Sequence, residues 1–350
     1  MTWTSIWGDI STLEAVLRDA SGKTIRPFLA KARIVQNGYS LGLQRAALDF
    51  AAESPYAKVA GRIKEHYRID LPAGGAARIA GKHLAAIDDQ AAMPAPRRGE
   101  SPTQLIASVD GCMVPVVMPG DPLQPRTLGW MELKLCMVRV HGETEAAFAG
   151  SIGEPAKAGV HLAALAAAAA PQTAPPIHAI GDGAPWIAEQ VELAFGARSS
   201  YLIDWFHACE YLSAAAPAFA KSGQPGWLDE MKSHLAEGRP KEVLAALLPR
   251  RERARKAGSK KSTPVRDCWR YLSKRLGQLG YKEALAAGLP IGSGEIESAH
   301  RYVVQARLKR SGAWWKPENA QAMVRLRAMR LNGRWEEYWS AKLEVNELSL

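Results

Sequence analysis

The chain has 350 residues, which is more than one average domain and leaves room for two or three small ones. Its 47% of hydrophobic residues is ordinary for a globular protein, and the formal net charge of +10 favours an anionic partner, most commonly nucleic acid. The four cysteines are far apart without a CxxC pair, which argues against a zinc ribbon and a disulfide scaffold. We expect a cytoplasmic protein, because no secretory signal is visible and the alanine-rich run 158–170 is too short to span a bilayer.

Residues 1–90 are predicted to be helical. Apolar residues repeat at helical spacing, and Ser54-Pro55 is suited to begin a helix. The expected helices lie at about 43–50, 56–67 and 76–87. Two short helices joined by a tight turn suit a helix-turn-helix that reads DNA, with Arg78 and Lys82 as candidate contacts. Packing within a small helical bundle is the equally weighted alternative.

Residues 91–103 are rich in Pro, Gly, Arg and Ser and are predicted to be a linker. Beyond them the pattern changes to short apolar and alternating runs. Strands are expected at about 105–110, 130–140, 144–150, 177–180 and 201–203, with helices at about 156–170 and 186–195. Three strands, helix, strand, helix, strand is the order of a ribonuclease-H-like α/β domain. We predict such a core over 104–205 and 291–312.

Residues 206–290 are predicted to form an all-helical insertion, because the segment is highly charged and has no strand-like runs. Its basic stretch suits contact with phosphates, and a solvated loop is the alternative. The candidate contacts are Arg251, Arg253, Arg255 and Lys260.

Three carboxylates stand where a sheet would collect ligands. Asp110 is expected to end the first strand and Asp182 the fourth, at the edge where open α/β sheets bind their ligands. Glu297 would lie near the start of a helix capped by Ser293. Glu295 competes with it, although that residue could instead complement the positive helix end. Carboxylate oxygens suit Mg²⁺ or Mn²⁺, and a pair of such ions can serve phosphodiester displacement.

Asp204 and His207 follow the fifth predicted strand, three residues apart. They are accessory candidates that could position a phosphate or a ligand, and a structural hydrogen bond is an equal alternative. The sequence contains no GxxxxGK[ST], HExxH or GxSxG motif, and its one Gly-Ser-Gly lacks the third glycine of a dinucleotide fingerprint.

A set of motifs occurs in one order over about residues 100–340: VDGCMVP, WMELK, AIGDGAPWI, LIDWFHACEYL, LPIGSGEIESAHRYVVQARLKRSGAWW and RAMRLNGRWEEYW. They resemble the ISKra-type bacterial insertion-sequence transposases, relatives of the ISL-type and Mutator-like DDE enzymes. The resemblance implies a ribonuclease-H-like catalytic domain with a helical insertion before the last acidic helix. It also implies that Asp110, Asp182 and Glu297 are the catalytic triad that binds Mg²⁺ or Mn²⁺, with Glu297 favoured over Glu295.

The resemblance further implies that the partners are DNA, as terminal inverted repeats and target DNA, and further copies of the chain in a homo-oligomer. The protein would then associate with the bacterial nucleoid when bound. Two features depart from the family pattern: a short N-terminal region without cysteine pairs, and His300 and Arg301 where a lysine is expected nearby. Either residue could hold a phosphate. Lys134, within WMELK, is a further accessory candidate.

The end of the chain, 313–350, is predicted to form basic helices. Arg307, Lys309 and Arg310 directly precede it and are candidate phosphate contacts. Trp314 and Trp315 could stack on bases of distorted or single-stranded DNA, and the alternative is that both lie in the core.

The leading hypothesis is a DDE transposase that cleaves and joins DNA. A nuclease of the same fold without strand transfer would use the same carboxylates. A catalytically dead, transposon-derived DNA-binding protein is the third hypothesis, and the intact acidic triad argues against it.

Overall fold

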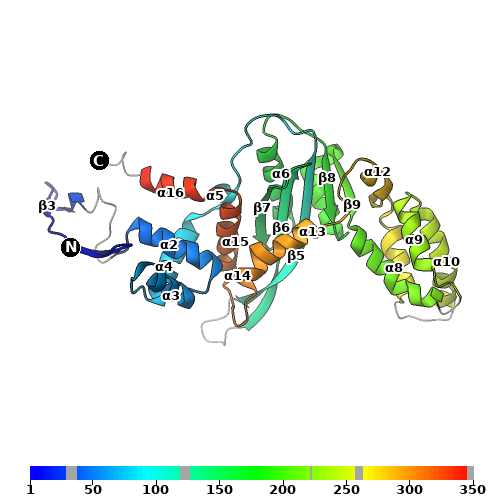
Figure 1. Cartoon of the computed structure of the whole chain (residues 1–350), viewed down its shortest axis with the longest axis horizontal. Helices are drawn as coiled ribbons and strands as arrows, with labels where there is room; N and C mark the ends of the chain where they lie inside the picture. The colour runs from blue at the N-terminus through cyan, green and yellow to red at the C-terminus, as the bar shows by residue number, and fades with distance from the viewer. Residues whose placement is uncertain (29–37, 119–126, 221–222, 257–262, 345–350) are drawn as a thin grey trace. The chain divides into compact units, whose positions relative to one another are not determined.

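The computed structural model of the protein describes residues 1–28, 38–118, 127–220, 223–256 and 263–344 (Figure 1). The chain forms two compact units, each built from segments that are distant in the sequence. Unit 1 comprises Met1–Ala95, Met113–Met131 and Arg301–Leu350, and unit 2 comprises Pro96–Cys112 and Glu132–His300. The division differs from the predicted one, because residues 113–131 and 301–312 fall in unit 1. None of the helices in the described ranges is both long and apolar enough to cross a membrane.

The described residues contain one mixed sheet of five strands, so the predicted α/β class is confirmed. Its strands are β5 (Leu105–Met118), β6 (Thr127–Val140), β7 (Ala146–Ile152), β8 (Ile177–Gly181) and β9 (Ser199–Ile203). They are arranged in the order β7-β6-β5-β8-β9. β8 pairs in parallel with β5 and β9, and β6 pairs antiparallel with β7. From β5 to β9 the chain order of strands and helices is the predicted one.

The first strand of this sheet is longer than predicted. β5 was expected to end at Asp110, but it continues through Gly111 to Met118. The expectation was wrong because Asp-Gly, a common turn signal, is followed here by the apolar run CMVPVVM, which has strand propensity. Pairing with β8 nevertheless stops early, at Ser108↔Ile180. Asp110 therefore lies just beyond the paired part of β8, although it does not end its own strand.

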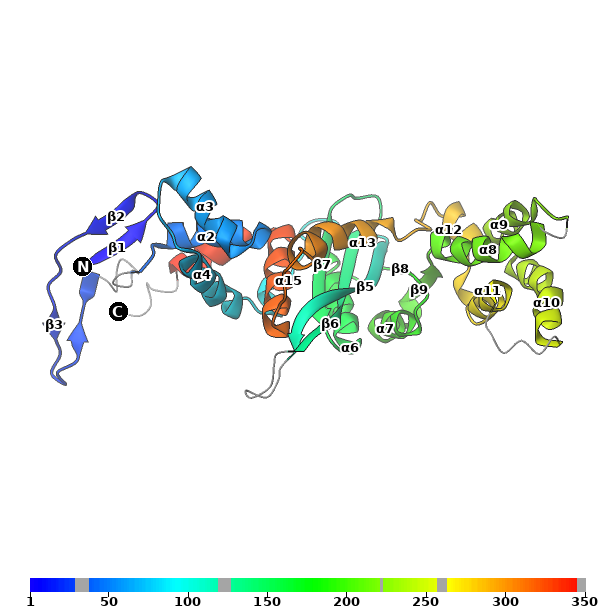
Figure 2. The same cartoon turned by 90° about the horizontal axis from the view of Figure 1, so that it is seen from below.

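Helices cover both faces of the sheet. α6 (Ala156–Ala169) packs on β7 and on α7 (Pro185–Phe195), and α7 packs on β9. A short helix, α13 (Gly294–Ala299), is followed by a π-helical turn over His300–Gln305 and by α14 (Ala306–Leu308). Figure 2 shows α6 and α7 on one face of the sheet and α13 on the other. This arrangement brings α13 over the face opposite the crossover helices.

The predicted helical insertion forms a compact cluster within unit 2 (Figures 1 and 2). Its α-helices are α8 (Trp205–Ala220), α9 (Trp227–Ala236), α10 (Pro240–Lys256), α11 (Pro264–Ser273) and α12 (Tyr281–Ala286). A continuous apolar core joins them to the end of β9, through buried residues such as Ile203, Leu212 and Leu272. The insertion is thus packed onto the sheet by its own hydrophobic core.

Unit 1 contains the three helices predicted for the N-terminal region and the two at the C-terminal end. They are α2 (Leu41–Glu53), α3 (Tyr56–Tyr67), α4 (Ala73–Ala86), α15 (Pro317–Leu331) and α16 (Trp335–Glu344). A one-turn helix, α5 (Asp89–Ala92), spans the predicted boundary between the N-terminal region and the linker. α4 packs on both α2 and α3. DNA reading by α3 and α4 stays a prediction.

The first residues are not helical, which corrects the prediction for 1–90. They form two hairpins, β1 (Thr2–Ser5) with β2 (Gly8–Ser11) and β3 (Leu17–Arg18) with β4 (Thr24–Ile25). Gly8 and Gly22 adopt the positive φ angles, 105° and 80°, that favour glycine in tight turns. The strands are only two to four residues long, so their sequence carries little periodicity that could be recognised.

Candidate active site

The three predicted catalytic carboxylates line one cavity in unit 2. The cavity has a volume of about 120 Å³ and is lined by Val109, Asp110, Gly181, Asp182, His207, Ser293, Ile296 and Glu297. Asp110 comes from β5, Asp182 directly follows β8, and Glu297 comes from α13. Residues from three segments far apart in the sequence therefore meet at one place.

The sheet register explains why the two aspartates meet. Ser108 pairs with Ile180 in the parallel ladder between β5 and β8. Asp110 and Asp182 each follow their member of this pair by two residues, so the two carboxylates extend side by side from neighbouring strands. Because side chains alternate along a strand, both leave the same face as Ser108 and Ile180.

Asp110 is half-buried and closely surrounded. Its Oδ1 accepts the Gly111 N–H at 2.7 Å, and His300 Nε2 lies 3.1 Å from its carbonyl oxygen and 3.4 Å from Oδ2. Burial raises the pKa of Asp110; His300 and the Gly111 N–H oppose the rise, and the charges of Asp182 and Glu297 add to it. Asp182 and Glu297 are therefore close enough to repel the carboxylate of Asp110, and a bound cation would relieve that repulsion.

The loop that carries Asp182 is held by the helical insertion. The Asp182 carboxylate accepts the Ala184 N–H at 2.7 Å, and its carbonyl accepts the Tyr271 hydroxyl at 2.7 Å. Arg275 Nε donates to the carbonyl of Gly183 at 2.8 Å. Gly183 has φ +81°, and a Cβ there would lie 2.6 Å from the Tyr271 hydroxyl, so only glycine fits. Tyr271 and Arg275 were not predicted as part of the site; the only signal for them in the sequence is Gly183, next to Asp182, which suits a close approach of other groups.

Glu297, and not Glu295, faces the cavity. Glu295 forms two hydrogen bonds of 2.8 Å with the guanidinium of Arg139. Glu297 lines the cavity and accepts the Ser293 hydroxyl at 3.1 Å. Ser293 occupies the predicted N-cap position, but its side chain makes no capping bond to the helix backbone. That part of the prediction was wrong, because the hydroxyl is bonded to Glu297 instead.

Asp204 and His207 form a pair at the same cavity. Asp204 is fully buried, and its carboxylate accepts the backbone N–H groups of His207, at 2.8 Å, and of Ser293. Burial alone would raise the pKa of Asp204, but the bonds from His207 and Ser293 outweigh it and hold the pKa far below its usual range. Asp204 therefore remains ionised, and its charge is directed at His207.

His207 is the cationic member of the site. Its Nδ1 lies 3.6 Å from Asp204 Oδ1. The interaction with Asp204 raises the pKa of His207 to about 9, against the effect of burial and with help from Asp182 and Glu210. One ligand atom each of Asp204, His207 and Glu297 lies within 4.8 Å of the others. This second group shares Glu297 with the carboxylate triad.

Three accessory candidates differ in their placement. His300 is buried against Asp110, as described above. Lys134 does not line the cavity: it is buried, and its Nζ binds Glu132 at 2.7 Å and the carbonyl of Gly153 at 2.8 Å. Glu132 lies against Gly111, the strand neighbour of Asp110, and hence on the opposite face of the sheet. Arg301 belongs to unit 1 and is exposed.

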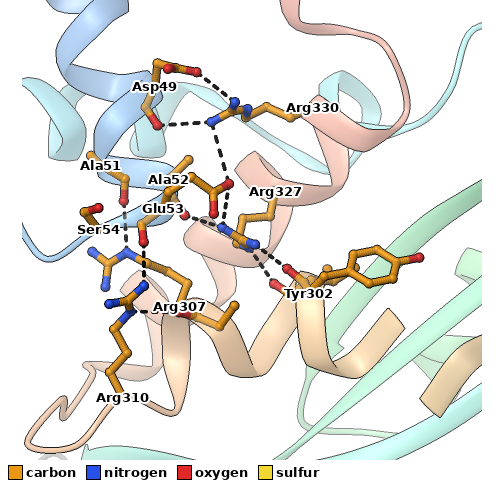
Figure 3. A network of polar contacts seen from close by, with 12 residues as sticks. Asp49, Ala51, Ala52, Glu53, Ser54, Tyr302, Arg307, Arg310, Arg327 and Arg330 are labelled. Atoms are coloured by element: carbon orange, nitrogen blue, oxygen red, sulfur yellow. Dashed lines mark hydrogen bonds and ion pairs between the residues drawn. The ribbon is translucent and has the colours of Figure 1, made fainter. Parts of the chain in front are cut away.

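The predicted phosphate contacts separate into buried and exposed residues. Arg307 is 3% exposed, and its Nε donates to the carbonyl of Ala51 at 2.9 Å, so the structure corrects its prediction as a DNA contact. Figure 3 shows Arg307 and Arg310 directed at the C-terminal end of α2. Arg310 donates to the Glu53 carbonyl at 2.9 Å but remains exposed. Carbonyls at a helix end need donors, and these guanidinium groups supply them.

The other candidates stay predictions. Exposed side chains belong to Arg78, Lys82, Arg253 and Lys309. Arg251 is half-buried, with its guanidinium 3.7 Å from the ring centroid of Trp269. The side chain of Arg255 and the whole of Lys260 lie outside the described residues.

Residues 171–342 match the model of a family described as "Uncharacterised protein family (UPF0236)". The match covers just under half of the chain. It includes the segments that carry Asp182, Asp204, His207 and Glu297, whereas Asp110 lies before it. No curated protein matches the chain.

Proposed function

We propose that the chain is a DDE-type DNA transposase of the ISKra kind, which cleaves DNA strands and transfers them to a target. One observation carries the proposal: Asp110 on β5, Asp182 directly after β8 and Glu297 on α13 line a single cavity with their carboxylates. The strand order β7-β6-β5-β8-β9 and the helical insertion between β9 and α13 support the interpretation of the fold as ribonuclease-H-like. The positive net charge supports DNA as the partner.

The carboxylate triad fits a divalent cation. Mg²⁺ and Mn²⁺ prefer carboxylate oxygens, and the three groups offer these from one side of the sheet. The raised pKa of Asp110, due first to burial and then also to the charges of Asp182 and Glu297, indicates acidic charge that a cation would neutralise. When bound, a pair of such cations would activate water or a 3′-hydroxyl and stabilise the leaving oxygen.

In the metal-free site, Asp204 and His207 suit a contact with a phosphate. A histidine with a pKa of about 9, raised by Asp204, is protonated at neutral pH and offers donors instead of a lone pair. The Asp204 carboxylate already accepts the N–H groups of His207 and Ser293. We therefore assign His207 the role of donating a charge-assisted hydrogen bond to a phosphate oxygen of the bound strand. Asp204 keeps the imidazole charged and oriented.

The test is cleavage and joining of duplex DNA that carries the ends of the encoding insertion sequence, with Mg²⁺ or Mn²⁺. Wild type is compared with Asp182→Asn, which keeps an oxygen to accept the Ala184 N–H, and with Asp229→Asn, which alters an exposed carboxylate of the same unit. We expect wild type and Asp229→Asn to cleave and join ends. Asp182→Asn should bind DNA and do neither.

Other outcomes select the alternatives. Cleavage by wild type without joining would favour a nuclease of the same fold. DNA binding by wild type without cleavage would favour a transposon-derived binding protein. If Asp182→Asn cleaves as fast as wild type, the carboxylate triad is not the catalytic centre and the proposal is wrong.

A further inference from the structure

Two exposed tryptophans lie side by side in unit 1. Trp130 on β6 is 56% exposed, and Trp314, in the loop between α14 and α15, is 41% exposed. Their ring centroids are 6.1 Å apart and their planes meet at 63°, an edge-to-face arrangement. Single exposed apolar residues are common on protein surfaces, but two adjacent tryptophan rings form a patch that is characteristic of a binding surface.

The backbone of the loop fixes which tryptophan is exposed. Trp315 pairs with β5: its N–H donates to the carbonyl of Pro115 at 3.2 Å, and its carbonyl accepts the Val117 N–H at 2.8 Å. Its ring is buried, and the indole N–H donates to the carbonyl of Leu308 at 3.2 Å. Neighbouring side chains of an extended segment point to opposite sides, so Trp314 is turned outward. Both tryptophans were predicted either to stack on bases or to lie in the core. Trp315 lies in the core, whereas Trp314 is on the surface.

The same loop is strongly basic. Residues 309–316, KRSGAWWK, contain three cations and no acid. Lys309, Arg310 and Lys316 are exposed. Arg310 is anchored to the carbonyls of Ala306, at 2.7 Å, and Glu53, so it holds the loop while adding positive charge. A surface with this charge complements a phosphodiester backbone.

We propose that Trp130 and Trp314 form a stacking platform for unpaired bases of a DNA strand whose phosphates contact Lys309 and Lys316. Aromatic side chains within a basic groove are the recurring means of binding single-stranded nucleic acid. In a duplex the base faces are covered by neighbouring base pairs, so the platform selects bases that have left the stack. Because the planes of the two rings meet at 63°, they cannot sandwich one base, and each ring offers its own face.

The proposal rests on the proposed function only in that DNA is the partner. The platform lies wholly in unit 1 and contains none of the carboxylates of the cavity. Its binding can therefore be measured without divalent cations and without any cleavage step, so that the two proposals can fail separately.

The experiment is equilibrium binding of the full chain, in the presence of EDTA, to fluorescein-labelled oligothymidine and to a duplex of equal length. The variants are Trp130→Ala, Trp314→Ala and the conservative Trp314→Phe. The matched control is Trp7→Ala, which removes a tryptophan that is 88% exposed elsewhere in unit 1. We expect each alanine variant at the platform to weaken oligothymidine binding by about 5- to 150-fold, the range expected for one lost stacking contact.

Trp314→Phe should retain most of the affinity, because it keeps an aromatic face, and Trp7→Ala should bind as wild type. Duplex affinity should be unchanged in all four variants. Equal oligothymidine affinity of wild type and both alanine variants would overturn the platform, as would an equal loss of single-strand and duplex binding. If Asp182→Asn abolishes cleavage while the tryptophan variants bind normally, only the platform fails; the converse result leaves the platform and removes the catalytic proposal.

Discussion

Glu295 and Glu297 lie two residues apart on α13 and have different partners. Glu295 is held by Arg139 through two hydrogen bonds of 2.8 Å, whereas Glu297 accepts the Ser293 hydroxyl and faces the cavity with Asp110 and Asp182. Side chains two apart on a helix do not share a face, which explains the difference. The two glutamates thus form a matched pair, one in the cavity and one in a salt bridge.

We expect Glu297→Gln to reduce DNA cleavage on the order of 100-fold or more, because it removes a charged ligand for the cation. Glu295→Gln should leave cleavage within about twofold of wild type and cost about 1 kcal/mol of stability through the weakened Arg139 pair. Cleavage rates at saturating Mn²⁺ and urea unfolding measure the two effects. A larger loss of cleavage in Glu295→Gln than in Glu297→Gln would reverse the assignment.

The crowding of carboxylates predicts a gain in stability when one is neutralised. Burial and the charges of Asp182 and Glu297 raise the pKa of Asp110, so unfolding releases a proton and metal-free stability falls as the pH rises through that pKa. Asp182→Asn removes one charge that repels Asp110 and attracts protonated His207; we expect the lost repulsion to be the larger effect, so that the metal-free protein gains up to about 1 kcal/mol of stability at neutral pH.

Thermal unfolding of wild type and Asp182→Asn, in EDTA and in Mn²⁺, checks this prediction. Mn²⁺ should stabilise wild type and have little effect on the variant, because one of its ligands is lost. Asp229→Asn again serves as the exposed control. A destabilised Asp182→Asn in EDTA would show that the Asp182 charge has a structural partner that outweighs the repulsion.

Substitution of Arg327 tests how much the arginine network in Figure 3 contributes to the stability of the protein. It is buried, and its guanidinium donates to the carbonyls of Val303, at 2.7 Å, Ala52 and Tyr302, and lies 3.0 Å from the Glu53 carboxylate. We expect Arg327→Lys to destabilise the protein by about 3 kcal/mol, because an ammonium cannot reproduce the planar fork of donors.

The matched control for this variant is Arg310→Lys, whose side chain is exposed although it also binds carbonyls. Its cost should stay below about 1 kcal/mol. Urea unfolding followed by circular dichroism gives both values. Equal costs at the two positions would mean that burial of Arg327 adds nothing to its contribution.

The sequence allowed the sheet and the two aspartates to be predicted, because strands with buried faces are continuous apolar runs and Asp110 and Asp182 are at or close to the ends of two of them. It could not separate Glu295 from Glu297 by residue type, since the decisive partner, Arg139, is 156 residues away from Glu295. Tyr271 could not be predicted for the same reason, because its hydrogen bond to the Asp182 carbonyl joins residues that are 89 positions apart in the sequence.

A basic stretch of sequence does not show which of its arginines are exposed. Arg307 lies in a basic stretch of the kind that binds phosphates. Its guanidinium is nevertheless buried and donates a hydrogen bond to the carbonyl of Ala51. Burial depends on the tertiary fold and cannot be inferred from a basic stretch. The N-terminal hairpins were missed because strands of two to four residues have too few positions for a period to emerge.

The pair formed by Asp204 and His207 makes a pH-dependent prediction. Because Asp204 raises the pKa of His207 from 6.5 to about 9 while its own pKa is held below the usual 3.8, the pair stabilises the fold fully between pH 3.8 and pH 6.5. That contribution is lost as the pH rises through about 9, and it also declines as the pH falls below 3.8. Asp204→Asn removes the largest cause and should bring the pKa of His207 down toward 6.5. Asp182→Asn removes a lesser cause and should lower the pKa of His207 by a smaller amount.

NMR titration of the imidazole C–H resonances in the full chain measures these values, with the His207 signal identified by its loss in His207→Gln. The order of the pKa values should be wild type highest, then Asp182→Asn, then Asp204→Asn. A His207 that titrates near 6.5 in wild type would be neutral at physiological pH. It would then have a lone pair to offer a metal, and the group formed by Asp204, His207 and Glu297 would replace the proposed phosphate contact.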